Sequence, residues 1–139
     1  MCSEDVVSKG EWTIEAGVDK GILVLLEPDE NVRDALQTLL QGLGWSIAAE
    51  KEPQNLKAVL AKREVTAVIS EASLPGCPAV DVLRACAQRR VPVIFTGHNL
   101  PAQDAVDLIR QGGYDYLEKP FQQERLLDLL KGLTNRHNS

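Results

Sequence analysis

The chain has 139 residues, of which 44% are hydrophobic, 25% charged and 4% aromatic. This supports one globular domain of ordinary size and excludes global disorder. The formal net charge is -5 at pH 7, which argues against a surface built mainly for nucleic acid or anionic lipid. No segment approaches the ~20 apolar residues of a membrane span, so neither nucleic acid nor a membrane is an expected partner.

The first 20 residues are polar and lack the apolar core of a signal peptide. We expect residues 1–20 to form a flexible leader, although residues 11–15 alternate between apolar and polar types and can also pair as an edge strand. The cysteines, at positions 2, 77 and 86, are an odd and scattered set. They are interpreted as reduced thiols, which indicates a cytoplasmic protein.

From residue 21 onward, apolar runs of strand length alternate with segments of helical spacing. The expected strands are 22–26, 45–49, 66–70, 91–95 and 114–117, and helices follow Asp29, Pro53, Pro78, Pro101 and Pro120. This alternation predicts a doubly wound α/β fold, (βα)5, with a five-stranded parallel sheet and helices on both faces. The last strand is short and less apolar, which favours an edge position. The domain is expected to span 21–133, followed by a polar tail, 134–139.

Polar residues stand where four of these strands end. In a parallel sheet with helices on both faces, the working site lies at the carboxyl ends of the strands. These residues are Glu27, Pro28 and Asp29 after the first strand, Glu71 after the third, Thr96 after the fourth, and Lys119 after the fifth. The sequence therefore predicts that carboxylates, a hydroxyl and one ammonium group converge at one edge of the sheet.

Four sequence pieces at these strand ends carry a family resemblance: ILVLLEPDENVR, SEASLPG, VPVIFTG and GGYDYLEKPF. From about Gly21 to Leu133 the chain resembles the receiver domain of bacterial response regulators, a CheY-like module of two-component phosphorelay signalling. The last piece is the most specific and is similar to the receivers of NtrC-type transcriptional regulators. The resemblance implies a flavodoxin-like fold and a role in signal transduction.

In this family, an aspartate after the third strand takes a phosphoryl group from a histidine kinase, and an acidic pair after the first strand holds Mg²⁺. A Thr or Ser and a Lys bind the phosphoryl oxygens, and a nearby aromatic residue rotates to signal the change. The resemblance places the phosphoacceptor position at Glu71 and the acidic pair at Glu27 and Pro28. The matching phosphoryl-binding and switch residues are Thr96, Lys119 and Tyr116, and a cis Lys119–Pro120 bond is also implied.

Two of these positions depart from the family pattern. Glutamate at position 71 is longer than aspartate by roughly 1.3 Å, and a misplacement near 1 Å costs on the order of a hundredfold in rate. Pro28 offers Mg²⁺ no side-chain ligand, and Asp29 is better placed as a helix cap. We therefore expect no cofactor and no enzymatic activity. If a metal ion were bound, its candidate ligands would be Glu27, Asp29 and Glu71.

Three functions remain open. The first is a pseudo-receiver that acts by protein contact without phosphorylation, in which Glu71 either mimics the active state or locks the inactive one. The second is a working phosphoacceptor. The third is a flavodoxin-like cofactor binder, but the acidic run from Glu27 to Glu30 would repel a phosphate there. A purely structural ion pair between Glu71 and Lys119 is an equally simple interpretation of those two residues.

The expected partner is a histidine kinase, an output domain or a second copy of this chain. In receivers the output face comprises the fourth helix, fifth strand and fifth helix, here about 101–133. Its charged residues are Asp104, Asp107, Arg110, Asp115, Glu118, Glu124, Arg125 and Asp128, and its leucines are at 126, 127, 129, 130 and 133. One or two of these leucines should remain partly exposed, which gives an apolar centre with a mixed-charge rim. We expect this face to form a homodimer or to dock a partner; the alternative is an ordinary solvated face.

Overall fold

The computed structural model describes residues 14–15, 20–50 and 53–138. They form an open sheet in the order β1-β3-β2-β4-β5-β6. The strands are β1 (Ile14–Glu15), β2 (Ile22–Leu26), β3 (Ser46–Glu50), β4 (Val65–Glu71), β5 (Val93–Gly97) and β6 (Asp115–Glu118). The strands from β2 to β6 are parallel, as the sequence predicts, and β6 is at the edge.

The sheet has one strand more than the five that the sequence predicts. β1 pairs antiparallel with β3, so that Ile14 lies opposite Ala48. The edge-strand interpretation of residues 11–15 is therefore confirmed for two residues. The rest of the expected leader, 1–13 and 16–19, lies outside the described residues.

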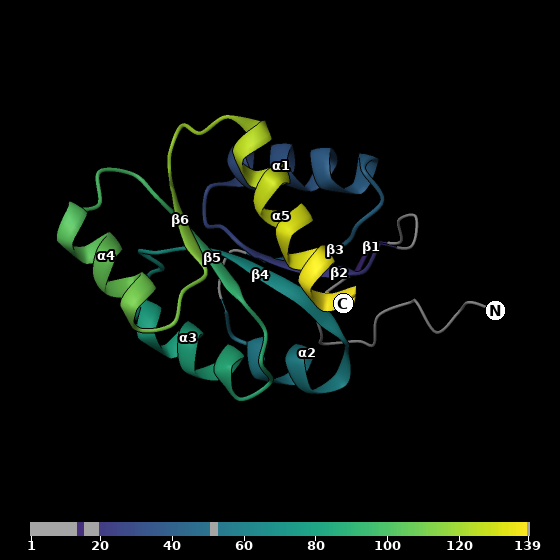
Figure 1. The fold of residues 1–139 in the computed structure, drawn as a ribbon, viewed down its shortest axis with the longest axis horizontal. Coiled ribbons are helices and arrows are strands. Elements are labelled where there is room, and N and C mark those ends of the chain that lie inside the picture. The colour runs from purple at the N-terminus through teal and green to yellow at the C-terminus, as the bar shows by residue number, and fades with distance from the viewer. Residues whose placement is uncertain (1–13, 16–19, 51–52, 139) are drawn as a thin grey trace.

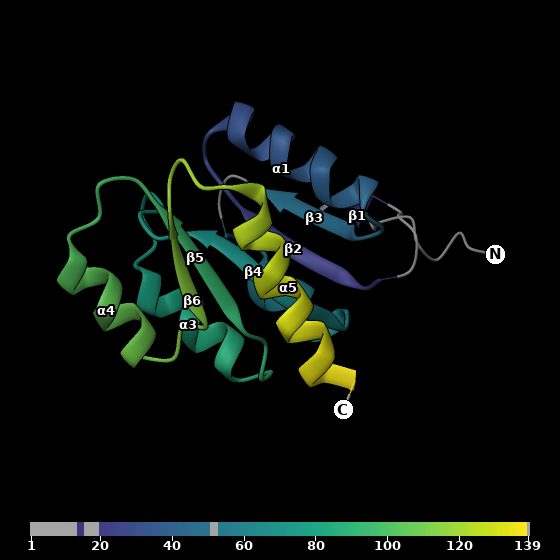
Figure 2. The ribbon, with the colours of Figure 1, turned by 45° about the horizontal axis from the view of Figure 1, so that its top comes forward.

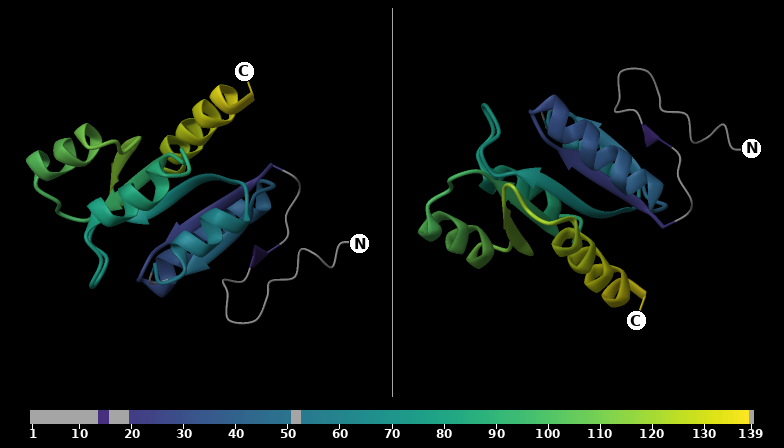
Figure 3. Two further views of the ribbon diagram at one scale, coloured as in Figure 1. Left: turned by 90° about the horizontal axis from the view of Figure 1, so that it is seen from below. Right: turned by 90° about the horizontal axis from the view of Figure 1, so that it is seen from above.

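Five helices cover the two faces of the sheet. They are α1 (Glu30–Gly42), α2 (Leu56–Lys62), α3 (Ala79–Ala87), α4 (Ala102–Arg110) and α5 (Gln123–Asn138). Figures 1 and 2 show α1 and α5 on one face and α2, α3 and α4 on the other. The views in Figure 3 show α1 over β2 and β3 and α5 farther along the sheet, in agreement with the contacts of α5 with β4.

The last helix extends past the expected end of the domain. The domain is expected to span 21–133, whereas α5 continues through Asn138. The apolar spacing of the sequence stops at Leu133, but a polar sequence without proline can continue a helix. The expected polar tail therefore belongs, in backbone conformation, to α5.

Two hydrophobic layers result from the alternation of side chains along the strands. Leu23 and Leu25 of β2 face α1 and α5, whereas Val24 and Leu26 face the helices on the other side. All four side chains are buried, which explains why β2 is an unbroken apolar run in the sequence. Within the described part of the chain, no helix combines the length and hydropathy needed to cross a bilayer.

The sheet edge that carries the predicted site is formed by strand ends and by the starts of helices. Asp29 caps α1, since its Oδ1 accepts hydrogen bonds from the backbone N–H groups of Asn31 and Val32, at 2.9 and 3.2 Å. Such a cap satisfies amide groups that lack a partner in the helix. The cap predicted from the sequence is confirmed, and it places the turn after β2 directly beside the end of β4.

Candidate functional site at the carboxyl edge of the sheet

The strands bring four of the predicted site residues to one edge. Glu27 directly follows β2, Glu71 is the last residue of β4, and Lys119 directly follows β6. Thr96 lies in β5 and is in register with Glu71 on the neighbouring strand. The convergence expected from parallel strand ends is therefore present in the structure, from positions up to 92 residues apart in the chain.

Lys119 joins the two glutamates. Its Nζ donates to Oε1 of Glu27 at 2.7 Å and to Oε1 of Glu71 at 2.5 Å. The exposed fractions of the three side chains are 17% for Lys119, 1% for Glu27 and 11% for Glu71. One ammonium group thus neutralises part of the charge of two buried carboxylates. We call the cluster of Lys119, Glu27 and Glu71 the Lys119 triad.

The other oxygen of each glutamate also has a donor. Oε2 of Glu27 accepts from the backbone N–H of Asp29 at 3.0 Å, and Oε2 of Glu71 accepts from that of Ser73 at 3.2 Å. All four carboxylate oxygens of the triad therefore accept hydrogen bonds from N–H groups of the protein. The Arg33 guanidinium adds a second positive charge nearby, because it donates to the backbone carbonyl of Glu27 at 2.8 Å.

The environment of Lys119 favours its charged form. Burial lowers the pKa of this ammonium group, but the hydrogen bonds and charges of Glu27 and Glu71 more than offset burial, so that its pKa is raised above the ordinary value. Lys119 is consequently protonated throughout the physiological range. When both carboxylates are ionised, the triad has one positive and two negative charges, which gives a net formal charge of -1.

Asp29 and Pro28 take other positions. The Asp29 carboxylate is exposed and turns back onto the start of α1, where it caps the helix. Pro28 occupies the second position of the family's acidic pair and has no side-chain oxygen or nitrogen. Of the three candidate metal ligands, Glu27, Asp29 and Glu71, only the two glutamates therefore belong to the triad.

Tyr116 belongs to a separate hydrogen-bonded group. Its hydroxyl donates to Oε1 of Glu118 at 2.7 Å, and Oε2 of Glu118 accepts from the backbone N–H of Asn99 at 2.7 Å. Burial and the carboxylates of Glu118 and Glu71 raise the pKa of Tyr116, while the two hydrogen bonds lower that of Glu118. A Cβ on Gly97 would come within 2.5 Å of the Tyr116 hydroxyl, so this glycine makes room for the tyrosine.

Several contacts of this edge were not predicted from the sequence. Glu118 was considered only as a surface charge, although it stands two residues after Tyr116 and thus on the same side of the strand. Arg33 lies one helical turn after Asp29, but no sequence pattern indicates that its side chain returns to Glu27.

The cis Lys119–Pro120 bond implied by the family resemblance is present.

A doubly wound sheet with an acidic cluster, a threonine and a lysine at its carboxyl edge defines the class of receiver-like signalling modules. The model of the response regulator receiver domain family matches residues 23–131. The chain belongs to this family.

The relatives are mostly longer transcriptional regulators. Response regulator protein FleR of Pseudomonas aeruginosa is 35% identical over 111 residues, which cover 78% of this chain and 23% of that protein. The C4-dicarboxylate transport transcriptional regulatory protein DctD of the same organism is 33% identical over 111 residues, which cover 78% of this chain and 24% of that protein. The chain thus spans about a quarter of these relatives.

Solved structures confirm the fold. Full-length FixJ from B. japonicum aligns with a TM-score of 0.76 and 26% identity, covering 84% of this chain and 59% of FixJ. A receiver domain from Clostridium thermocellum aligns with a TM-score of 0.77 and 17% identity, covering 85% of this chain and 97% of that one. The predicted CheY-like α/β fold is confirmed.

Proposed function

We propose that this chain is a pseudo-receiver of two-component signalling, which acts through protein contacts without phosphorylation of Glu71 and without Mg²⁺. The observation that carries the proposal is the Lys119 triad, in which one ammonium group bridges Glu27 and Glu71 at 2.7 and 2.5 Å. A fixed internal cation thus occupies the space between the carboxylates that a receiver normally presents to a metal ion and a phosphoryl group.

The donor set does not fit Mg²⁺. This ion requires near-ideal octahedral coordination by oxygen, whereas the four carboxylate oxygens of Glu27 and Glu71 already accept hydrogen bonds from the protein. Pro28 supplies no ligand, and Arg33 adds a positive charge beside Glu27. Among the described residues, no group of three His, Cys, Asp or Glu side chains is arranged as metal ligands.

The same contacts oppose phosphoryl transfer. An attacking carboxylate oxygen must be free to approach phosphorus in line, and the transferring oxygens need a positive charge to stabilise them. Both oxygens of Glu71 are engaged, and the Lys119 ammonium is already paired with two carboxylates. The competing function is a working phosphoacceptor, which the retained Thr96 and Lys119 favour.

Incubation with Mg²⁺ and acetyl phosphate, followed by intact mass measurement, tests the proposal. We expect no added phosphoryl group, whereas a receiver with aspartate at the acceptor position should be labelled under the same conditions. Glu71→Gln serves as the control that identifies the labelled residue. A mass increase in the unmodified chain that disappears in Glu71→Gln would establish a working phosphoacceptor and contradict the pseudo-receiver.

The surface formed by α4, β6 and α5 is the proposed partner face. Its most exposed apolar side chains are Val106 and Ile109, at 43% and 44%, one helical turn apart on α4. On α5, Leu127 and Leu129 are half-buried, whereas the other three leucines are buried. Apolar groups inside a rim of both charge signs are typical of a protein–protein patch and allow two-fold self-pairing.

We expect Arg110→Glu combined with Arg125→Glu to weaken self-association roughly tenfold, because the change removes the positive charges that pair with acidic groups of the other copy. Sedimentation velocity over a range of concentrations measures this. Asp34→Arg, at an exposed position on α1, is the matched control and should leave association unchanged. Loss of association in the Asp34 variant alone would assign the interface to α1 instead.

A further inference from the structure

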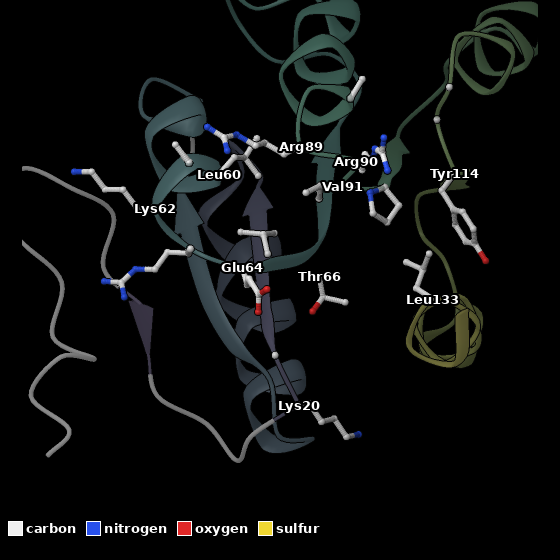
Figure 4. A pocket seen from close by; sticks show the side chains of 18 residues that line it. Lys20, Leu60, Lys62, Glu64, Thr66, Arg89, Arg90, Val91, Tyr114 and Leu133 are labelled. Atoms are coloured by element: carbon white, nitrogen blue, oxygen red, sulfur yellow. The ribbon is translucent and has the colours of Figure 1, made fainter. Parts of the chain in front are cut away.

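A second candidate site lies at the opposite edge of the sheet from the Lys119 triad. An open hollow of about 1160 Å³ is formed where β2, β4, β5 and β6 begin. Figure 4 shows it between the end of α2, the turn after α3, the start of β6 and α5. None of the residues that line it belongs to the receiver site described above.

The hollow is strongly basic in an acidic chain. Among the described residues that line it, five are basic, Lys20, Lys62, Arg63, Arg89 and Arg90, and one, Glu64, is acidic. A third of the 15 Lys and Arg residues of the chain therefore lines this hollow. The local charge is opposite in sign to the net charge of -5.

Four of these five basic groups have no ion-pair partner within the described part of the chain. Among the described residues, no carboxylate lies within ion-pair distance of Lys20, Arg63, Arg89 or Arg90. The turn that carries the two arginines is nevertheless well defined, since the N–H of Val91 donates to the carbonyl of Cys86 at 3.0 Å. The backbone of this turn is thus ordered, and the side chains of Arg89 and Arg90 are exposed to an outside group.

Apolar side chains lie between the charges. Leu60, Val91, Pro92 and Leu133 line it, and Figure 4 shows the charged ends of Arg89, Arg90 and Lys62 pointing in different directions around it. The hollow is larger and more open than a site for a small molecule, and its charges do not converge on one point as they would around a phosphate. An extended ligand with several spaced negative charges and apolar groups between them fits this pattern.

We propose that this hollow docks an acidic segment of a protein partner, with carboxylates against the basic rim and aliphatic side chains on the apolar floor. Nucleic acid fits less well, because the net negative charge of the chain repels a long polyanion whereas a short acidic segment experiences mainly the local positive field. The site lies away from Glu71, so the proposal does not depend on whether Glu71 is phosphorylated.

Fluorescence anisotropy with a fluorescein-labelled peptide of repeating Asp-Glu-Leu units tests this docking site. We expect saturable binding that weakens as salt is raised, because charge pairs at a rim are screened. Arg89→Glu combined with Arg90→Glu should weaken binding about tenfold, and Lys20→Glu combined with Arg63→Glu should do the same from the other side of the hollow. Lys57→Glu with Arg84→Glu reverses the same number of charges at exposed positions of α2 and α3 that do not line the hollow, and this variant should bind like the unmodified chain.

Four results would contradict the proposal. One is the absence of saturable binding up to about 1 mM peptide, and another is an equal loss of binding in the Lys57 and Arg84 control. The third is tighter binding of single-stranded DNA than of the peptide with loss in the same two pairs of variants, which would assign the hollow to nucleic acid. Replacing leucine by serine in the probe should weaken binding, and an unchanged affinity would contradict the role of the apolar floor.

Discussion

Replacing Lys119 with methionine should destabilise the fold by about 3 kcal/mol or more. The substitution keeps most of the aliphatic stem but removes the ammonium group that bridges Glu27 and Glu71. Two carboxylates, with 1% and 11% of their side-chain surface exposed, would then face each other without a compensating charge. Chemical denaturation at pH 7, compared at unchanged slope, measures the difference in the free energy of unfolding.

Two further variants separate this cause from a general packing effect. Lys131→Met removes an exposed lysine from α5 and should change stability by less than about 0.5 kcal/mol. Adding Glu27→Gln and Glu71→Gln to Lys119→Met removes the repulsion together with the cation, and should restore much of the lost stability. If Lys119→Met proves as stable as Lys131→Met, the triad contributes nothing to the fold.

The pH dependence of stability gives an independent view of the same contact. The pKa of Lys119 is raised in the folded state from 10.5, because the hydrogen bonds to Glu27 and Glu71 outweigh the effect of burial. Its contribution is therefore fully present below that pH and is lost as the pH rises through the folded-state pKa. The unmodified chain should lose stability in this alkaline range, and Lys119→Met should lack that part of the loss.

The sequence was sufficient for most of the fold because local pattern and global topology agree. The run Ile22–Leu26 has no polar residue and is followed by Glu27, so it predicts a strand that is buried on both faces. β2 is such a strand. Expectation and structure differ where burial no longer determines the backbone. The domain is expected to end at Leu133, whereas α5 continues through Asn138.

The site was predicted at the level of position but only partly at the level of contact. Parallel strand ends place Glu27, Glu71, Thr96 and Lys119 at one edge without further information. The pairing of Lys119 with Glu71 was one of the interpretations left open, but its simultaneous contact with Glu27 was not. That contact depends on the side-chain rotamers of two residues that are 92 positions apart, which no local pattern in the sequence encodes.

Placing aspartate at positions 28 and 71 should convert the chain into a metal-dependent phosphoacceptor. Pro28→Asp supplies the missing member of the acidic pair, and Glu71→Asp shortens the acceptor by one methylene group, which removes it from its contact with Lys119. Lys119 and Thr96 remain at the positions that match the phosphoryl-binding residues of the family. We expect the double variant to bind Mg²⁺ and to gain one phosphoryl group from acetyl phosphate, which intact mass measures.

The size of the gain follows from how sharply phosphoryl transfer depends on geometry. A displacement near 1 Å costs on the order of a hundredfold in rate, and the metal that stabilises the transferring oxygens needs its oxygen ligands in place. Each single substitution should therefore remain unlabelled, and only the pair should react. Pro28→Asp with Glu71→Asn is the matched control, because it keeps the size of the acceptor but removes its nucleophile. A folded double variant that binds Mg²⁺ but is not labelled would mean that the loop after β4 holds position 71 at the wrong angle, so that the loss of reactivity extends beyond the two side chains.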